Sequence, residues 1–375
     1  MNNDDLKVPQ FKSFVDKGDF AALEKVFENN YIAEGPFAKE FHDRLLETTG
    51  AKYGCFASNG TLALYLAMKA LGIGAGDEVL VQDITFIASA NAVEMVGAKP
   101  VFVDIVSYDD PTIDLSKIVL TKNVKAMVIA HLFGTACSNI LEIKKYCQDN
   151  NLLLVEDAAQ ALAIDSKYGH CGTFGDVGTF SFYADKTITT GEGGFVVTNN
   201  EQTYERMLYL RNQGRLKSGT FVHPEIGYNF RMTDMQCALG LAQYAKLDYI
   251  IERKHYIYNK YLSLLGDKVQ FLKLNPDFAH IPFRVVVYTP KAHEVMAEMS
   301  QVNIEARTVF YPLHQQPCYQ YLGYSDAGFE QSVKCYEQGM CLPTWVGISD
   351  EMIEKVAYNL IKAIEKVKLN EGDKQ

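Results

Sequence analysis

The region from residue 53 to about residue 160 alternates short apolar runs with stretches of helical periodicity, and this alternation restricts the fold more than any other feature. The apolar runs include residues 53–57, 79–81 and 126–130. Strands that alternate with helices of about 10–15 residues are typical of βαβ units and a mostly parallel sheet. Ligands of such sheets bind at the carboxyl ends of the strands. The pattern therefore predicts an α/β domain whose site lies where several strands end.

A single lysine between two later apolar runs is the second constraint. Residues 180–182 and 195–197 are predicted strands, and Lys186 lies in the polar, glycine-rich segment between them. A lysine held between buried strands loses solvent, which lowers the pKa of its amine and makes the amine nucleophilic. A surface lysine in a hairpin turn is the alternative, and this stretch alone leaves both interpretations open.

An earlier apolar run, residues 152–155, precedes Lys186 in the chain. It leads into Asp157 and then into small residues. A carboxylate at the end of a buried strand and a lysine on the next loop are the pair that pyridoxal phosphate (PLP) requires. The carboxylate keeps the pyridine nitrogen protonated, and the lysine forms a Schiff base with the aldehyde. Asp157 and Lys186 are therefore predicted to bind PLP, with Lys186 as the catalytic residue.

These stretches, together with residues 187–194, resemble the DegT/DnrJ/EryC1/StrS family of sugar aminotransferases, and the resemblance extends over roughly residues 30–360. It implies the aspartate aminotransferase-like fold, PLP fold type I. A large PLP-binding domain, residues 1–245, would begin with a helical segment and hold a mostly parallel sheet sandwiched by helices. A smaller C-terminal α+β domain would span residues 246–375. The resemblance also implies a homodimer with shared active sites.

The resemblance assigns the cofactor phosphate to the turn that follows the first strand. Gly60 and Thr61 would bind it at the start of a helix, with Ser181 from a neighbouring strand, and Asn229 would reach the phosphate in the partner subunit's site. On the residues alone, the turn fits an anion site because the first amides of a helix have no intrahelical partner. Ordinary capping of that helix is the alternative interpretation.

Two further residues are assigned to the cofactor ring on the resemblance. Phe86 would stack on the pyridine face, and Gln160 would hydrogen-bond near the ring hydroxyl. As an isolated phenylalanine, Phe86 fits a place in the core better, so this assignment rests on the resemblance. Asp185, beside the lysine, could assist proton transfer, although an aspartate that forms the turn is the simpler interpretation.

The resemblance implies transfer of an amino group, commonly from L-glutamate, through pyridoxamine phosphate to a keto sugar used for O-antigen or another surface polysaccharide. Residues 187–194 and 309–314 resemble family members that aminate C4 of a nucleotide-linked 4-keto-6-deoxy sugar, with GDP favoured over UDP or dTDP. Arg307 and His314 are the candidates for substrate contact. Pairing of Arg307 with Glu305 and a backbone hydrogen bond from His314 are the alternatives.

Three other activities are compatible with the same fold. A free keto sugar acid would be served by the same catalytic core. Sugar dehydratases that use pyridoxamine phosphate have histidine in place of the lysine, so Lys186 argues against that reaction. A non-catalytic, regulatory sugar-binding protein would have no need for Asp157 and Lys186 together.

Charge and cysteine content limit the partners. The chain has 46 acidic and 36 basic residues, a net charge of −10, with no block of like sign, which argues against nucleic acid and anionic membranes. No apolar stretch reaches the roughly 18 residues of a membrane span, and the polar N-terminus is unlike a signal peptide. The eight cysteines lack CxxC spacing, so we expect free thiols, no metal site and a cytoplasmic protein.

Overall fold

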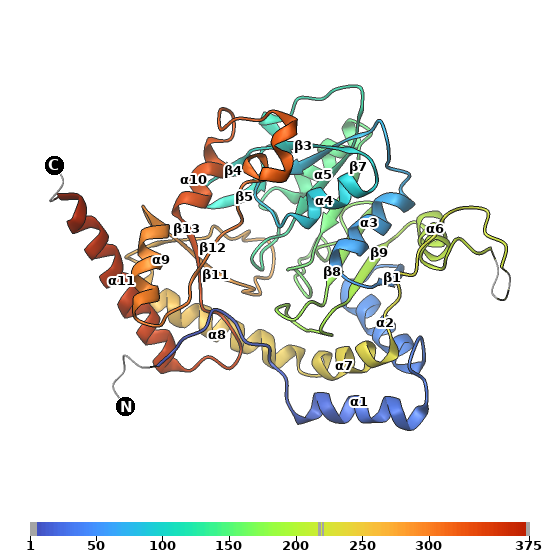
Figure 1. Ribbon diagram of the computed structural model, residues 1–375, viewed down its shortest axis with the longest axis horizontal. Helices are drawn as coiled ribbons and strands as arrows, with labels where there is room; N and C mark the ends of the chain where they lie inside the picture. Colours follow the sequence, from blue (N-terminus) through green and yellow to red (C-terminus); the bar gives the residue numbers. More distant parts are fainter. Residues whose placement is uncertain (1–5, 217–218, 220, 373–375) are drawn as a thin grey trace.

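In the computed structural model, which describes residues 6–216, 219 and 221–372, a seven-stranded sheet forms the centre of the larger part of the molecule (Figure 1). Its strand order is β1–β9–β8–β7–β6–β2–β3. The strands are β1 Tyr53–Ala57, β2 Glu78–Gln82, β3 Lys99–Val103, β6 Val124–Ala130, β7 Leu153–Asp157, β8 Val177–Ser181 and β9 Gly194–Thr198. Neighbours from β3 to β8 pair in parallel, and β9 is antiparallel to both β8 and β1. The expected mostly parallel sheet is confirmed.

Helices cover both faces of this sheet. They are α2 Pro36–Thr49, α3 Gly60–Ala70, α4 Ala88–Met95, α5 Ile140–Asp149, α6 Glu201–Arg211 and α7 Asp234–Tyr244, preceded by α1 Lys17–Asn29. Residues of α2, α5 and α7 enter one core cluster, and residues of α3, α4 and α6 enter another. Successive side chains of a strand point to opposite faces, so Leu80 of β2 enters the first cluster and its neighbour Val81 the second. Burial on both faces explains the continuous apolar runs of the sequence.

A second, antiparallel sheet lies beside the first, with the order β10–β11–β13–β12. Its strands are β10 Gln270–Phe271, β11 Val285–Tyr288, β12 Arg307–Thr308 and β13 Gly339–Leu342. Helices α8 Leu247–Leu265, α9 Ala292–Gln301 and α11 Asp350–Gly372 contribute side chains to a shared core with it. The remaining elements are the hairpin β4 Ile105–Ser107 with β5 Asp110–Ile113, the short helices η2 Leu115–Lys117, η3 Leu313–Gln315 and η4 Pro317–Leu322, and α10 Glu330–Gln338.

The division into residues 1–245 and 246–375 stays a proposal, and residues 1–5 and 373–375 lie outside the described residues. Its boundary falls between α7 and α8, which follow one another across the lower half of the view in Figure 1. The N-terminal segment departs from this division, because Val8 pairs with Ile304 and is buried in the core of the second sheet. None of the described helices is long and apolar enough to cross a membrane.

Candidate active site

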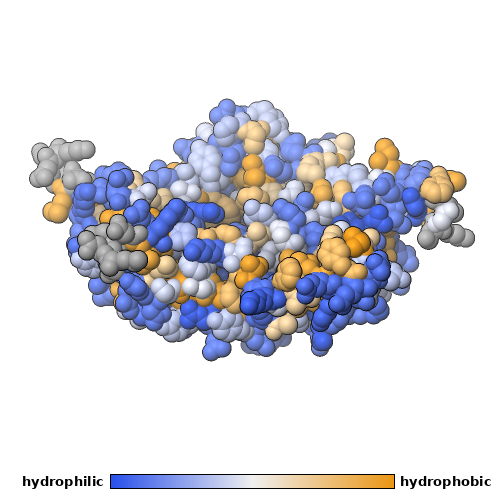
Figure 2. Space-filling view, turned by 60° about the horizontal axis from the view of Figure 1, so that its bottom comes forward, coloured by the Kyte–Doolittle hydropathy of each residue, from blue (hydrophilic) through white to orange (hydrophobic). Residues whose placement is uncertain are grey.

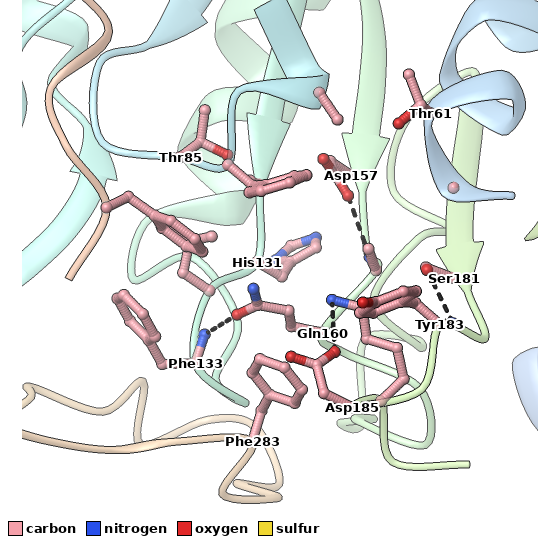
Figure 3. Close-up of a pocket in the computed structure, with 18 of the residues that line it drawn as sticks. Thr61, Thr85, His131, Phe133, Asp157, Gln160, Ser181, Tyr183, Asp185 and Phe283 are labelled. Carbon is pink, nitrogen blue, oxygen red and sulfur yellow. Dashed lines mark hydrogen bonds and ion pairs between the residues drawn. The ribbon is translucent and has the colours of Figure 1, made fainter. Parts of the chain in front are cut away.

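A cavity of about 750 Å³ lies between the carboxyl ends of the central strands and the second sheet. Most of the residues predicted for the site line it: Gly60, Thr61, Phe86, Asp157, Gln160, Ser181, Lys186 and Arg307. In Figure 3, Asp157 lies at the top of the cavity and Asp185 and Phe283 at the bottom, with His131 and Gln160 between them. The position of the site at the strand ends is the one predicted from the alternating pattern.

Lys186 is positioned by the loop that joins β8 to β9. The ends of this loop are closed by a hydrogen bond from Phe182 N to Gly193 O (2.9 Å), and Lys186 N donates to Tyr183 O at 2.9 Å. The lysine side chain is only 15% exposed, so the alternative of a surface lysine does not hold. Its Nζ lies 4.8 Å from the centroid of the Phe283 ring. Burial lowers the pKa of Lys186, which favours the neutral, nucleophilic amine.

Asp157 is the last residue of β7, and its carboxylate is buried at the cavity wall. Oδ2 accepts a hydrogen bond from Ser89 Oγ of α4 at 2.7 Å, and Oδ1 accepts one from Ala159 N at 3.2 Å. Burial raises the pKa of Asp157, whereas these two donors and the charge of Lys186 act to lower it. A protonated nitrogen of a bound ligand would supply the counter-charge that this buried carboxylate needs.

The expected phosphate site lies at the start of α3. Asn59 caps this helix, since its Oδ1 accepts from Leu62 N at 2.9 Å, so the amides of Gly60 and Thr61 are left for a ligand. Helix capping and anion binding are therefore compatible at this turn. A Cβ on Gly60 would lie 2.9 Å from the Cβ of Ser181, so only glycine leaves this approach open. Ser181 Oγ accepts from the amide of Tyr183 at 3.3 Å, and its hydroxyl proton is left to donate.

Phe86 and Gln160, the residues expected around the cofactor ring, both line the cavity. Phe86 is 55% exposed although it is large and apolar, and it lines the cavity rather than the core. An open ring face of this kind can stack on a flat ligand. Gln160 Oε1 accepts from Phe133 N at 2.7 Å, which fixes the side chain and leaves its amide nitrogen to donate (Figure 3).

The cavity is also lined by His131 and Arg284, to which the sequence analysis assigned no role. His131 Nδ1 accepts from the amide of Cys137 at 3.1 Å, so the proton lies on Nε2, which donates to Glu156 Oε2 at 2.8 Å. Its position directly after β6, at the carboxyl end of a strand where ligands bind, is visible in the sequence, but the sequence does not show what the imidazole contacts. Arg284 forms an ion pair with Asp185 at 2.5 Å, and no local pattern marks it because the second sheet brings it to the cavity.

The structure corrects the substrate role predicted for His314. This residue is 4% exposed and does not line the cavity. Its Nδ1 bonds to Asp83 Oδ2 at 2.7 Å, its Nε2 lies 3.2 Å from Asp326 Oδ1, and its ring stacks on Phe329. Burial lowers the pKa of His314, but the two carboxylates outweigh this effect and raise it. His314 thus links η3 to the end of β2. Both of its ring nitrogens have partners, so neither is left to hydrogen-bond a sugar.

Asn229 does not line the cavity of its own chain either. It is exposed, and its Oδ1 accepts a hydrogen bond from Arg231 Nε at 2.8 Å. An exposed position is compatible with a reach into a partner's site, so the role assigned to Asn229 stays a prediction.

The residues present fit PLP. Asp157 matches the ring nitrogen, Lys186 the aldehyde, and the start of α3 with Ser181 the phosphate. The close approach of Gly60 to Ser181 brings the phosphate donors of two different elements to one point.

Comparison with known proteins agrees with this site. Residues 14–361 match the DegT/DnrJ/EryC1/StrS aminotransferase family. The chain is similar to GDP-perosamine synthase of Escherichia coli O157:H7, with 40% identity over 294 residues that cover 76% of this chain and 80% of that protein. It is 34% identical over 363 residues to GDP-perosamine synthase of Vibrio cholerae, covering 95% and 98% of the two chains.

The fold is also that of a solved structure, the PLP-form of the putative sugar aminotransferase Spr1654 from Streptococcus pneumoniae. The two superimpose with a TM-score of 0.90 at 23% identity, over 96% of this chain and 100% of that chain. PLP is the cofactor of the family, as Asp157 and Lys186 led us to expect. The chain belongs to the DegT/DnrJ/EryC1/StrS aminotransferase family.

Proposed function

We propose that this PLP-dependent sugar aminotransferase transfers the amino group of L-glutamate to C4 of a GDP-linked 4-keto-6-deoxy sugar. The observation that carries the proposal is the common cavity in which the Lys186 amine and the Asp157 carboxylate are buried together. The similarity to two GDP-perosamine synthases supports the choice of substrate.

The cofactor, when bound, supplies an aldehyde that takes up the amino group and an electron-poor ring that stabilises the negative charge of the deprotonated carbon. Lys186 Nζ acts as the base that removes the proton from the α-carbon of the amino donor and returns a proton to the cofactor carbon. The lowered pKa of Lys186 favours the neutral amine that this step requires. Asp157 holds the proton on the pyridine nitrogen, which keeps the ring electron-poor.

The other cavity residues bind and orient. The amides of Gly60 and Thr61 and the hydroxyl of Ser181 hold the phosphate, and each bond to the charged group contributes about 1.5–3 kcal/mol. The Phe86 ring fixes the plane of the cofactor. The amide nitrogen of Gln160 donates a hydrogen bond near the ring hydroxyl of the cofactor.

Arg307 is assigned to an anionic group of the substrates, the nucleotide diphosphate or the glutamate carboxylate. It lines the cavity from β12, the edge strand of the second sheet, and is exposed. Glu305, the alternative partner, forms its ion pair with Lys7 instead, at 2.8 Å. Because the net charge of −10 does not attract anions, such a local cation is needed.

We also place the active sites in a homodimer. The segment before Asn229 carries large apolar side chains in full exposure: Phe221 is 83% exposed, Val222 74% and Ile226 81%. Figure 2 shows apolar side chains beside the grey residues at the right edge of the molecule, where this segment lies. An exposed group of this kind indicates an interaction surface. A partner chain would cover it and receive Asn229 at its cofactor phosphate.

A nucleotide-linked amino sugar is an activated building block, so we assign the product to the synthesis of O-antigen or another surface polysaccharide. All eight cysteines are free thiols, which supports a reducing, cytoplasmic location for this reaction.

The proposal is tested by incubating the holoenzyme and L-glutamate with GDP-, UDP- and dTDP-linked 4-keto and 3-keto sugars and with free keto sugar acids. Product masses should show that the ketone of the GDP-linked 4-keto-6-deoxy sugar is replaced by an amine. The Lys186→Ala variant is the control and should give no product while still binding PLP at the phosphate end. Amination of free sugars alone would contradict the nucleotide-linked substrate, and turnover by Lys186→Ala would contradict the role of Lys186.

A further inference from the structure

Asp185 lies between Lys186 and a cation from the second sheet. Its Oδ2 pairs with Arg284 Nη2 at 2.5 Å, and its Oδ1 lies 3.7 Å from Lys186 Nζ. Among the described residues, Oδ1 is buried and has no hydrogen-bond partner. The carboxylate is thus held through one oxygen, and the other oxygen is left facing the lysine.

The backbone around Arg284 is fixed against the central sheet. Phe283 N and Arg284 N both approach Phe133 O, at 3.1 and 3.4 Å, and Ile281 N donates to Gly134 O at 3.0 Å. Gly134 has a φ of 94°, and a Cβ there would lie 1.9 Å from Ile281 O. The backbone at Arg284 is therefore held by hydrogen bonds to the turn after β6, and this turn also lines the cavity.

The reaction places two opposite demands on Lys186. Its amine must be neutral to take a proton from the donor and protonated immediately afterwards. An anion at 3.7 Å favours the protonated amine, and a cation just beyond it disfavours that form.

We propose that Asp185 and Arg284 are a positioning pair for Lys186, in which Arg284 holds the Asp185 carboxylate in place and offsets its effect on the lysine charge. This inference rests on the proposed role of Lys186 in the function above. It assigns Asp185 a role beyond formation of the turn, and it gives Arg284 a role in orienting the catalytic lysine.

Other charged and titratable groups line the two cavities that Lys186 also lines. They are Asp157 of β7, His131 after β6, Tyr183 and Glu192 of the same loop, Arg307 of β12, Lys254 of α8 and Lys12 before α1. Burial lowers the pKa of Lys186, Asp185 and Asp157 raise it, and Arg284 lowers it. Asp157 also serves the cofactor, whereas Asp185 and Arg284 are assigned no contact with cofactor or substrate and can be changed without removing one.

The test uses three variants of the holoenzyme, Asp185→Asn, Arg284→Gln and the conservative Arg284→Lys. The absorbance of bound PLP is titrated with pH, and its midpoint reports protonation of the nitrogen that links Lys186 to the cofactor. Asp185→Asn removes the anion, so the midpoint should fall by about one pH unit. Arg284→Gln removes the cation, so the midpoint should rise, and Arg284→Lys should shift it less than Arg284→Gln does.

The melting temperatures of the cofactor-free variants separate this role from a structural one. Both Asp185→Asn and Arg284→Gln leave a partly buried charge unpaired, so both should melt at a lower temperature than the wild type. A purely structural pair would give these losses without midpoint shifts of opposite sign. The double variant Asp185→Asn/Arg284→Gln, in which neither charge is present, should titrate between the two single variants.

Midpoints that do not move, or that move in the same direction in Asp185→Asn and Arg284→Gln, would overturn the inference and leave the proposed function intact. The proposed role of Lys186 is tested separately, by borohydride reduction of the wild type followed by mass analysis. PLP that binds without becoming attached to Lys186 would overturn the proposed role of Lys186 and this inference with it.

Discussion

Two lysine amines lie near the ring of Phe283, but only Lys186 lines the large cavity. Lys186 Nζ lies 4.8 Å and Lys254 Nζ 5.9 Å from the ring centroid. Lys254 is 5% exposed and donates to Pro282 O at 3.2 Å. Burial lowers the pKa of Lys254 to about 8. Desolvation lowers the pKa of both amines, and access to the cavity decides which of them can serve the reaction.

Lys254 should make stability depend on pH in a definite direction. Its pKa is about 8 in the folded protein and 10.5 in the unfolded chain, so the unfolded state binds more protons between these values and stability rises with pH across this window. Lys254→Met removes this dependence. The free energy of unfolding of the variant, relative to wild type, should therefore increase by about 3 kcal/mol from pH 10.5 down to pH 8.

Chemical denaturation of the cofactor-free protein at several pH values measures this difference. Lys362→Met, which replaces an exposed lysine of α11, is the matched control for the loss of a lysine. A difference between Lys254→Met and wild type that stays constant from pH 8 to 10.5 would contradict the prediction.

The start of helix α3 and the end of strand β8 must lie close together to form the phosphate site. The first residue of α3, Gly60, lies against Ser181 at the end of β8. The helix supplies unpaired amides and the positive end of its dipole, and the strand supplies a hydroxyl. Neither element forms the site alone, so a change that separates them should affect the cofactor more than the fold.

Gly60→Ala should reduce the affinity for PLP by roughly tenfold or more, because its Cβ would lie 2.9 Å from Ser181 Cβ and force the phosphate donors apart. Fluorescence titration of the cofactor-free protein gives the Kd. The melting temperature without PLP should change little. Gly74→Ala is the control, since its Cβ would meet only Val96 O, at an ordinary 3.6 Å. Equal affinity of Gly60→Ala and wild type would show that the phosphate binds elsewhere.

Several large apolar side chains are exposed on the surface of the single chain. Besides Phe221 and Ile226, the described surface includes Phe20 and Phe27 of α1, which are 64% and 61% exposed. Figure 2 shows apolar side chains at the front of the view, over the region of α1. Together with the exposed Asn229, these side chains are expected at the dimer interface.

Subunit mixing tests this arrangement. Lys186→Ala and Asn229→Ala homodimers should each be inactive or nearly so. A heterodimer of the two combines an intact lysine on one chain with an intact asparagine on the other, and so contains one complete site. After random exchange, the mixture should recover roughly a quarter of the wild-type activity. No recovery, with exchange demonstrated by mass, would show that Asn229 acts within its own chain or not at all.

Features that depend on residues close together in the chain could be predicted from the sequence. Alternation of strands and helices predicted the parallel sheet, because burial on both faces makes each central strand a continuous apolar run. Asp157 and Lys186 were found for the same reason, since each stands at the end of an apolar run where the chain turns. The resemblance to a family added Gly60 and Ser181, and the cavity contains both.

Contacts between side chains of distant elements could not be predicted from the sequence. Arg284 lies 99 positions from Asp185, and His314 lies 231 positions from Asp83. These pairings depend on how the second sheet packs against the first, and the packing has no local signature. The same packing placed Arg284 in the cavity and turned the His314 ring away from it.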